Sequence, residues 1–525
     1  MNIKHKKNLK KQKPKKSKSK KQLEPIQNRI YNFARSRIRK LIVSDADSSR
    51  VYALIQRNAH NETIQLDTRK FELWLKSEFH RSTNLIPSDS YFNQASSLLY
   101  TEGLSDSPRE TIYNRVAMVE NTLYYDLGRP DWKLLKISSD AVEIVDMDET
   151  TPTFERKQNQ REQVAFQIAQ DDSALDDLVT LLRIPSEIQQ IFKVQLISFL
   201  LEHIPVPAMI FTGEQGSTKT TTSRTVKEIV DPSSGGNAIA FPRSNNDLII
   251  AIDQRYLATF DNVSFIDVEK SDTLCTAITG IGQPRRKLYR DEEEIIIAYK
   301  RKIIMNGIGV TIERPDLLDR CIFYNLRAPT EDERITEEEF NEKLSALLPR
   351  IFGHIAVVLQ RAFEIRDQVR IEMGKKPRFA DFGVYGEAIS RVLGYDNFSF
   401  VDDLTRIKEQ QETEIIENHP LVHTIERIMK NIGHYEKTIN DFFNEIRDIA
   451  TLERLNTTQM FFPSSANRVR NSIQRISSNL RTLGYEINIS QYTKNDGIHP
   501  KNRFVIYIDK VVDESISTVS TAQTA

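Results

Sequence analysis

The sequence predicts an α/β protein built around a parallel β-sheet, and the ends of three apolar segments support this fold class. The first segment, 208–211, leads through a glycine-bearing turn into a polar helical stretch. The second, 255–260, runs directly into Asp261, and the third, 302–305, ends at Asn306. Open α/β sheets bind ligands at the carboxyl ends of their strands, so these polar ends form the expected site.

The turn after the first strand has the pattern of a phosphate-binding loop. Residues 213–220 read GEQGSTKT, and glycine lets backbone N–H groups approach a polyphosphate closely. Lys219 would reach the β- and γ-phosphates and Thr220 would bind Mg²⁺, so ATP and Mg²⁺ are the expected cofactors. Thr218 stands where the usual pattern has a second glycine, and a β-branched residue suits a positive φ poorly. The residues expected to hold the nucleotide are Gly213, Glu214, Gln215, Gly216, Ser217, Thr218, Lys219, Thr220 and Thr221.

The other two strand ends supply the expected partners of this loop. Asp261 suits the second protein contact to Mg²⁺, because a carboxylate at the end of a buried strand lies beside the phosphates. Asn306 suits a residue that positions the attacking water, although an asparagine before Gly307 is also an ordinary turn residue.

Two arginines in the segment 313–326 are candidates for a contact between subunits. Arg314 and Arg320 lie in an expected exposed loop, from which either could reach the γ-phosphate bound by a neighbouring subunit. Such an arginine contributes strongly to the rate of phosphoryl transfer. The alternative is a surface arginine paired with Asp316 or Asp319.

Two regions combine cations with features suited to DNA. Segment 280–302 reads as a hairpin whose tip carries cations and a tyrosine, for phosphates and base stacking, or else as a solvated hairpin balanced by its acidic residues. Segment 463–508 reads helix, strand, turn, strand, as in a winged helix, which binds DNA or other proteins. The expected DNA-binding residues are Arg285, Arg286, Lys287, Tyr289, Arg290, Arg468, Arg470 and Arg475.

Composition is typical of a soluble intracellular protein. Of 525 residues, 39% are hydrophobic and 28% charged, and the net charge is zero because 11 lysines within residues 1–21 offset an acidic remainder. Two cysteines are too few for a disulfide framework or a zinc site. The longest apolar run, 194–211, is broken by charged residues and prolines, and no apolar core follows the first lysines. We therefore expect a cytoplasmic location, nucleoid-associated or nuclear according to the host, and no membrane partner.

These patterns divide the chain into seven segments. We expect a disordered lysine-rich arm at 1–23, a mixed α+β module at 24–150, a linker at 151–165, a P-loop ATPase core at 166–330, a helical lid or bundle at 331–417, a winged-helix-like domain at 418–510 and a disordered tail at 511–525.

An ordered series of motifs resembles one family of ATPases. GEQGSTKTTT, ATFDNVS, KLYRDEEE, KIIMNGIG and ERPDLLDRC are similar, in this order, to motifs of AAA+-like ATPases in mobile-element replication proteins. These include plasmid and phage primase-helicases of the C-terminal type and the superfamily-3 helicases. The resemblance covers about residues 170–400 and implies an AAA+-like P-loop fold.

The resemblance also implies roles for single residues. Asp261 with Asn262 would form Walker B, Asn306 would be sensor 1, and Arg320, or second Arg314, would be the arginine finger. The loop 213–220 would be Walker A and the segment 285–290 the DNA-gripping hairpin. Asn262 stands where many AAA+ enzymes have a glutamate that polarises water.

We therefore expect an ATP- and Mg²⁺-dependent DNA helicase or translocase that works as a homo-oligomeric ring, expected to be a hexamer. The ring would hold single-stranded DNA, and the winged helix would hold duplex DNA. Two other classes remain: an ATP-controlled DNA-binding initiator or regulator, and an AAA+ ATPase that remodels protein complexes without unwinding DNA.

Overall fold

The computed structural model describes residues 24–510 except 58–59, 281–283, 287–293, 297–299, 313, 375, 418–419, 456–461 and 492–503. The arm expected at 1–23 and the tail expected at 511–525 lie outside the described residues. The chain divides between Thr111 and Ile112 into two compact units, and each is described by itself.

The first unit is a four-stranded sheet with three helices. Its elements are α1 (Ile26–Arg37), β1 (Ile38–Ser44), β2 (Val51–Arg57), β3 (His60–Gln65), α2 (Arg69–Thr83), α3 (Asp89–Asp106) and β4 (Arg109–Glu110). The strand order is β3-β2-β1-β4, with β4 parallel to β1 and the other pairs antiparallel. Helix α2 begins where the Thr68 side chain accepts a hydrogen bond from the Phe71 amide, and it buries Phe71, Leu75 and Phe79 at helical spacing.

The second unit opens with a four-stranded antiparallel meander. Its strands are β5 (Val116–Val119), β6 (Thr122–Asp126), β7 (Lys133–Ile137) and β8 (Val142–Asp146). Strands were expected here, but within a module that ended at residue 150, whereas the division between the units falls at residue 111. The segment expected as a linker, 151–165, includes the buried Gln163, which hydrogen-bonds to Tyr125 and to the Ile229 carbonyl.

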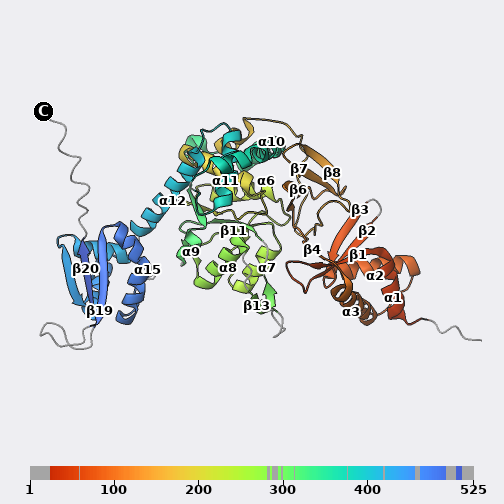
Figure 1. The fold of residues 1–525 in the computed structure, drawn as a ribbon, viewed down its shortest axis with the longest axis horizontal. Helices are drawn as coiled ribbons and strands as arrows, with labels where there is room; N and C mark the ends of the chain where they lie inside the picture. Colours follow the sequence, from red (N-terminus) through yellow and green to blue (C-terminus); the bar gives the residue numbers. More distant parts are fainter. Residues whose placement is uncertain are drawn as a thin grey trace, which may run out of the picture. The chain divides into compact units, whose positions relative to one another are not determined.

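A five-stranded parallel sheet forms the centre of the second unit (Figure 1). Its strands are β9 (Ala208–Thr212), β10 (Ile239–Ala240), β11 (Leu257–Asp261), β15 (Lys302–Asn306) and β17 (Cys321–Asn325). The order is β10-β11-β15-β9-β17, and each adjacent pair is parallel. After β9 the chain forms β10, β11 and β15, which all lie on one side of β9 in the strand order. It then forms β17 on the other side of β9, so β9 lies at a topological switch point.

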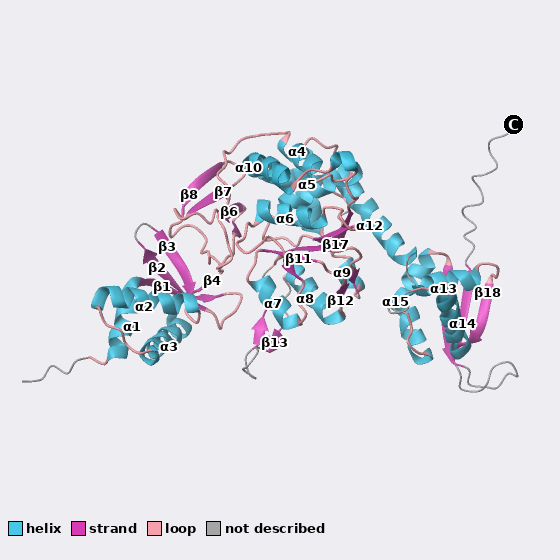
Figure 2. Cartoon of the chain, turned by 180° about the vertical axis from the view of Figure 1, so that it is seen from behind, coloured by secondary structure: helices cyan, strands magenta, loops and turns pink. Residues whose placement is uncertain are grey.

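Helices cover both faces of this sheet. They are α4 (Ala174–Leu181), α5 (Gln189–Ser198), α6 (Lys219–Val230), α7 (Asn245–Asp253), α8 (Val268–Thr279), α9 (Pro315–Leu318), α10 (Glu337–Glu372), α11 (Ala380–Val392) and α12 (Ser399–Glu417). Met209 and Phe211 of β9 belong to the apolar cluster shared with α5, α6, α10 and α11, whereas Ala208 and Ile210 pack with residues of α7 and α8. This alternation is the period of a strand buried on both faces. Figure 2 shows α5, α6 and α10 on one side of the sheet and α7, α8 and α9 on the other.

Short elements complete the central part of the unit. They are the 3₁₀ helices η1 (Ser186–Ile188) and η2 (Glu331–Glu333), the parallel pair β12 (Phe265–Ile266) and β16 (Thr311–Ile312), and the antiparallel pair β13 (Pro284–Arg286) and β14 (Glu294–Ile296). Strands β13 and β14 occupy the segment expected as a hairpin. Arg285 and Arg286, expected in its basic turn, lie in β13, and the rest of the expected tip, Lys287, Tyr289 and Arg290, lies outside the described residues.

The C-terminal part is a small helix-and-sheet domain. Its elements are α13 (Pro420–Met429), β18 (His434–Thr438), α14 (Ile439–Leu452), η3 (Ala466–Arg468), α15 (Val469–Thr482), β19 (Tyr485–Gln491) and β20 (Phe504–Lys510). Its antiparallel sheet has the order β18-β20-β19. Helix α15 buries Val469, Ile473, Ile476 and Leu480, the stripe that the sequence shows at steps of four and three.

Among the described residues, α10 alone is long and apolar enough to cross a membrane by length and composition. Of its most apolar stretch, 67% is buried inside the protein, as in the core helix of a globular domain. A membrane span is therefore not needed to explain this helix.

Candidate functional site

The loop between β9 and α6 has a conformation that its residues explain. Gly213 has φ = 139°, and a β-carbon there would lie 2.1 Å from the Leu326 carbonyl oxygen, so only glycine fits. Gly216 has φ = 83° and is exposed. Thr218 also adopts a left-handed conformation, with φ = 58°. For a β-branched residue this backbone costs about 1–3 kcal/mol, a strain that folded proteins concentrate at functional sites.

Lys219 folds back over this loop. Its Nζ donates hydrogen bonds to the carbonyl oxygens of Gly213 at 2.9 Å and Glu214 at 2.5 Å, and to the Ser217 hydroxyl at 3.0 Å. These three acceptors are neutral, and burial lowers the pKa of the ammonium group. A buried cation is stabilised best by an opposite charge, and here it has only neutral acceptors at a helix N-terminus. This arrangement favours the binding of an anion.

Thr220 and Asp261 meet beside the loop. The Thr220 hydroxyl donates to Asp261 Oδ1 at 3.0 Å, which joins the first turn of α6 to the carboxyl end of β11. The described residues contain no cluster of three or more His, Cys, Asp or Glu side chains that could hold a metal. A hydroxyl and one carboxylate are nevertheless the oxygen donors that suit Mg²⁺ when substrate phosphates and water complete its coordination.

Asn306 lies between these groups because β15 is inserted between β9 and β11. Its Nδ2 donates to the Ser223 hydroxyl at 2.8 Å, and its Oδ1 accepts from the Asn262 amide at 3.2 Å. Asn262 itself has φ = 58°. The buried amide thus connects α6 to the chain that follows Asp261. Ser223 was missed in the sequence, although its place four residues after Lys219 puts both side chains on one face of the helix.

The structure thus brings Lys219, Thr220, Asp261, Asn262 and Asn306 to the carboxyl edge of the sheet. The remaining loop residues take up different positions around them. Glu214 and Gln215 are exposed, Ser217 is buried against Lys219, and Thr221 is half-buried on α6.

Arg320 lies at the opposite edge. Its carbonyl oxygen accepts a hydrogen bond from the amide of Ala208, the first residue of β9, whereas Lys219 follows the last residue of that strand. The guanidinium group forms an ion pair with Asp316, the partner considered in the sequence. Its Nε is buried without a hydrogen bond.

Arg314 precedes α9 and is half-exposed. It forms an ion pair with Asp272 of α8 at 3.1 Å, a partner that the sequence did not suggest. This contact raises the pKa of the guanidinium group, which therefore stays charged.

The expected DNA-binding residues lie in two regions. Arg285 and Arg286 belong to β13, whose side chains are outside the described set, and Lys287, Tyr289 and Arg290 are also outside it. In the C-terminal domain, Arg468 and Arg470 are exposed, and the Arg470 guanidinium lies 5.7 Å from the centre of the Phe504 ring. The side chain of Arg475 is not described.

Two family models match the chain. Residues 175–399 match the actinomycete integrative conjugative element replication protein, AICE RepA, and residues 421–511 match the AICE RepA C-terminal domain. These two segments belong to that family of replication proteins. The AICE RepA matches contain the whole candidate site and the C-terminal domain. No curated protein matches the sequence.

Solved structures give weaker likenesses. The C-terminal region of NrS-1 is 13% identical, with a TM-score of 0.40 over 92% of this chain and 99% of that chain. The JCV helicase is 18% identical, with a TM-score of 0.23 over 45% of this chain and 64% of that chain.

Proposed function

We propose that this mobile-element replication protein is an ATP-dependent DNA motor with an AAA+-like P-loop core. The proposal rests mainly on one observation: four side chains lie close together at the carboxyl edge of the sheet, beside a glycine-bearing loop. They are Lys219, Thr220, Asp261 and Asn306. The loop follows β9, the strand at the topological switch point, where open α/β sheets bind ligands. Helicase or translocase activity in a ring of identical subunits, expected to be a hexamer, accounts for this site together with two cation-bearing regions.

Each residue has a chemical task in this proposal. Backbone N–H groups of the loop and Lys219 bind the phosphates, and Lys219 exchanges its carbonyl acceptors for phosphate oxygens. Thr220 and Asp261 hold Mg²⁺, which neutralises charge on the phosphate oxygens when bound. Asn306 fixes the end of β11 relative to α6. The proton of the attacking water needs a carboxylate as its acceptor, and Asn262 has an amide at the position where a glutamate would serve. We therefore assign this role to Asp261 as well.

The direct test is ATP hydrolysis by the full chain, measured with and without single-stranded DNA, followed by a strand-displacement assay. Hydrolysis stimulated by DNA and accompanied by strand displacement supports a motor. Hydrolysis that DNA leaves unchanged would instead favour a protein-remodelling ATPase.

The alternative favoured by a specific observation is an ATP-controlled initiator or regulator. Asn262 cannot accept a proton as a glutamate can, and slow turnover would follow from this difference. Slow hydrolysis combined with tight, site-specific binding of duplex DNA would favour this alternative.

We predict that the C-terminal domain, proposed here to be a winged helix, binds duplex DNA through exposed arginines at the start of α15. The double substitution Arg468→Ala and Arg470→Ala should weaken duplex binding and lower the salt dependence of the affinity by about one unit of slope for each lost phosphate contact. Binding titrations at several salt concentrations measure this slope.

The control is Arg447→Ala, which removes an exposed arginine from α14 of the same domain. Melting curves check that the loss of the Arg470–Phe504 contact leaves the domain folded. An unchanged salt slope in the double variant would favour a domain that binds protein.

We predict that the segment 285–290 couples hydrolysis to DNA. Replacing Arg285, Arg286 and Tyr289 together by alanine should retain ATP hydrolysis without DNA but remove its stimulation by single-stranded DNA, because cations and a stacking ring are lost together. Hydrolysis and strand displacement are measured on the same preparation. Unwinding at the wild-type rate would exclude the hairpin as the part that moves DNA.

A further inference from the structure

Helix α6 and strand β11 are joined at both of their ends. At the site, the Thr220 hydroxyl donates to the Asp261 carboxylate. At the far end, two side chains at the end of α6 hold the backbone of Leu257, the first residue of β11. Asp231 Oδ2 accepts from the Leu257 amide at 3.1 Å, and Lys227 Nζ donates to the Leu257 carbonyl at 2.8 Å. Together these contacts set the position of α6 along the direction of β11.

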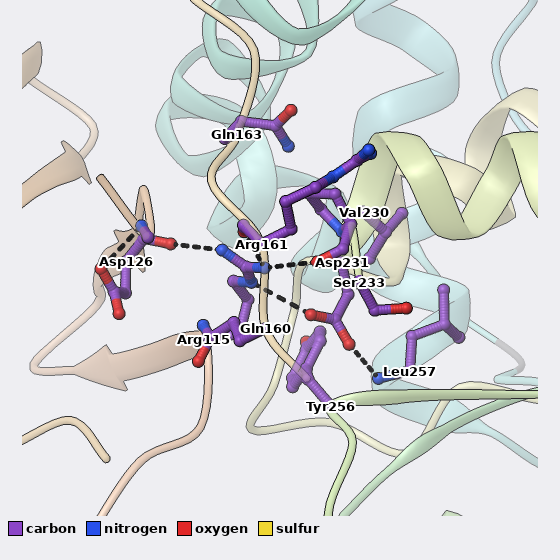
Figure 3. Close-up of polar contacts among 12 residues, drawn as sticks. Arg115, Asp126, Gln160, Arg161, Gln163, Val230, Asp231, Ser233, Tyr256 and Leu257 are labelled. Atoms are coloured by element: carbon purple, nitrogen blue, oxygen red, sulfur yellow. Dashed lines mark hydrogen bonds and ion pairs between the residues drawn. The ribbon is translucent and has the colours of Figure 1, made fainter. Parts of the chain in front are cut away.

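Arg115, from the chain just before β5, secures this far end (Figure 3). The side chain is fully buried, and its Nε donates to Asp231 Oδ1 at 3.0 Å. Its two terminal nitrogens donate to the carbonyl oxygens of Asp126 at 3.1 Å, Arg161 at 2.7 Å and Pro232 at 2.9 Å. Arg115 therefore connects the β5–β8 sheet and the segment 151–165 with the turn that ends α6.

Charge and backbone conformation both show that Arg115 is held in place. Burial alone would raise the pKa of the Asp231 carboxyl, but the Lys227 and Arg115 cations outweigh burial and lower it to about 2. The carboxylate thus stays ionised between two cations. Arg115 has φ = 67°, a strained conformation for a long side chain, which the surrounding contacts maintain.

The same sheet satisfies other groups at the C-terminus of α6. The Tyr125 hydroxyl donates to the Val230 carbonyl at 3.0 Å, and Gln163 Nε2 donates to the Ile229 carbonyl at 2.9 Å. The last carbonyls of a helix have no partner within the helix, so these side chains cap it. The β5–β8 sheet and the segment after it therefore hold one end of α6, and the candidate site lies at the other end.

The two ends of α6 are close enough for a movement at one to reach the other. Thr220 and Lys227 are separated by about 10 Å along a helix, and Leu257 and Asp261 by about 13 Å along a strand. Both elements are rigid at this length, and Val226, Ile229 and Val230 of α6 pack in one apolar cluster with Leu257 of β11. A shift of α6 along β11 at Leu257 would therefore change the separation of Thr220 and Asp261.

We propose that Arg115 is a positioning residue for the divalent cation bound with the nucleotide, acting through Asp231 and α6 on the Thr220–Asp261 pair. The inference rests on the proposed function, since it assumes that this pair binds Mg²⁺. It assigns the β5–β8 sheet to the ATPase as a support for the helix that begins at the phosphate loop.

The test measures cation binding directly, without relying on activity. Mn²⁺ is titrated into the full chain with ATPγS and its free concentration is followed by electron paramagnetic resonance. Arg115→Met fills the space without the hydrogen bonds, and Lys227 still pairs with Asp231. The variant should bind Mn²⁺ about tenfold more weakly, the scale on which groups behind metal ligands act. Binding of a fluorescent ATP analogue without a divalent cation should be unchanged.

Arg156→Met is the matched control. Arg156 lies in the segment 151–165, to which Arg115 also donates, and its side chain is mostly buried. It donates to Asp126 and to the Arg129 carbonyl, and its guanidinium lies 3.7 Å from the centre of the Trp132 ring. These contacts do not involve α6. The control should therefore lose thermal stability without losing Mn²⁺ affinity.

The outcomes separate the inference from the proposed function. Wild-type Mn²⁺ affinity in a folded Arg115→Met protein, or an equal loss in Arg156→Met, would overturn the positioning role. If Arg115→Met does not fold, Arg115→Lys replaces it, since this variant keeps a charge beside Asp231 with fewer donors. It should show a smaller loss of Mn²⁺ affinity, and wild-type affinity would again contradict the inference. If the wild-type protein binds no Mn²⁺ with ATPγS, the proposed function fails, and this inference fails with it.

Discussion

Replacing Lys219 by alanine is expected to lower ATP hydrolysis by about 100- to 1,000-fold, the effect of removing one well-placed donor from developing charge. The ammonium group is buried and now donates to three neutral oxygens of its own loop. A nucleotide would replace these weak acceptors with charged phosphate oxygens, which form stronger hydrogen bonds with a cation. Steady-state hydrolysis with Mg²⁺ and single-stranded DNA measures the effect.

The control for Lys219→Ala is Lys343→Ala, which removes an exposed lysine from the first turns of α10. It should hydrolyse ATP at the wild-type rate. Melting curves without nucleotide should show that Lys219→Ala is folded, whereas stabilisation by ATP should be reduced. Hydrolysis by Lys219→Ala at the wild-type rate would mean that the loop is not the phosphate site, and the proposed function would be withdrawn.

The sequence was sufficient to predict the edge of the sheet at which the candidate site lies. Short apolar runs followed by a polar residue show where buried strands end, and those runs correspond to β9, β11 and β15. The sequence also raised the question of Thr218, and the structure answers that this residue does adopt a positive φ. Local patterns were enough because each of these features depends on residues that are near one another in the chain.

The sequence did not show how distant segments combine. Asn306 reaches Ser223 and Asn262 because β15 pairs with both β9 and β11, and strand order depends on contacts between remote residues. The role of Arg115 was missed for a related reason. Arginine is rarely buried, so a charged residue before a strand gives no sign that four acceptors surround it. The polar segment 151–165 was expected to be a linker, but its polar groups are used inside the protein, as Gln163 illustrates.

Arg320→Ala is expected to retain ATP binding and to lower hydrolysis by about 1,000-fold or more, the contribution of an arginine finger. Within one chain Arg320 cannot reach the site, because it lies beside the first residue of β9 and the loop follows the last. The first and last residues of β9, Ala208 and Thr212, are about 13 Å apart along the strand. Arg320 would therefore act on the nucleotide of a neighbouring subunit, after leaving Asp316. Nucleotide binding and hydrolysis are measured separately on the variant.

Mixing two inactive variants tests this trans action most sharply. Lys219→Ala lacks a working loop but has Arg320, whereas Arg320→Ala has the loop and lacks the finger. Mixed oligomers contain sites with the loop from one chain and the finger from the other, so part of the activity should return. Arg314→Ala, the second candidate, should remain active if Arg320 is the finger. If the two variants assemble into mixed oligomers that remain inactive, action in trans is excluded. Such oligomers contain sites that combine an intact loop from one chain with an intact Arg320 from the other, and these sites should hydrolyse ATP.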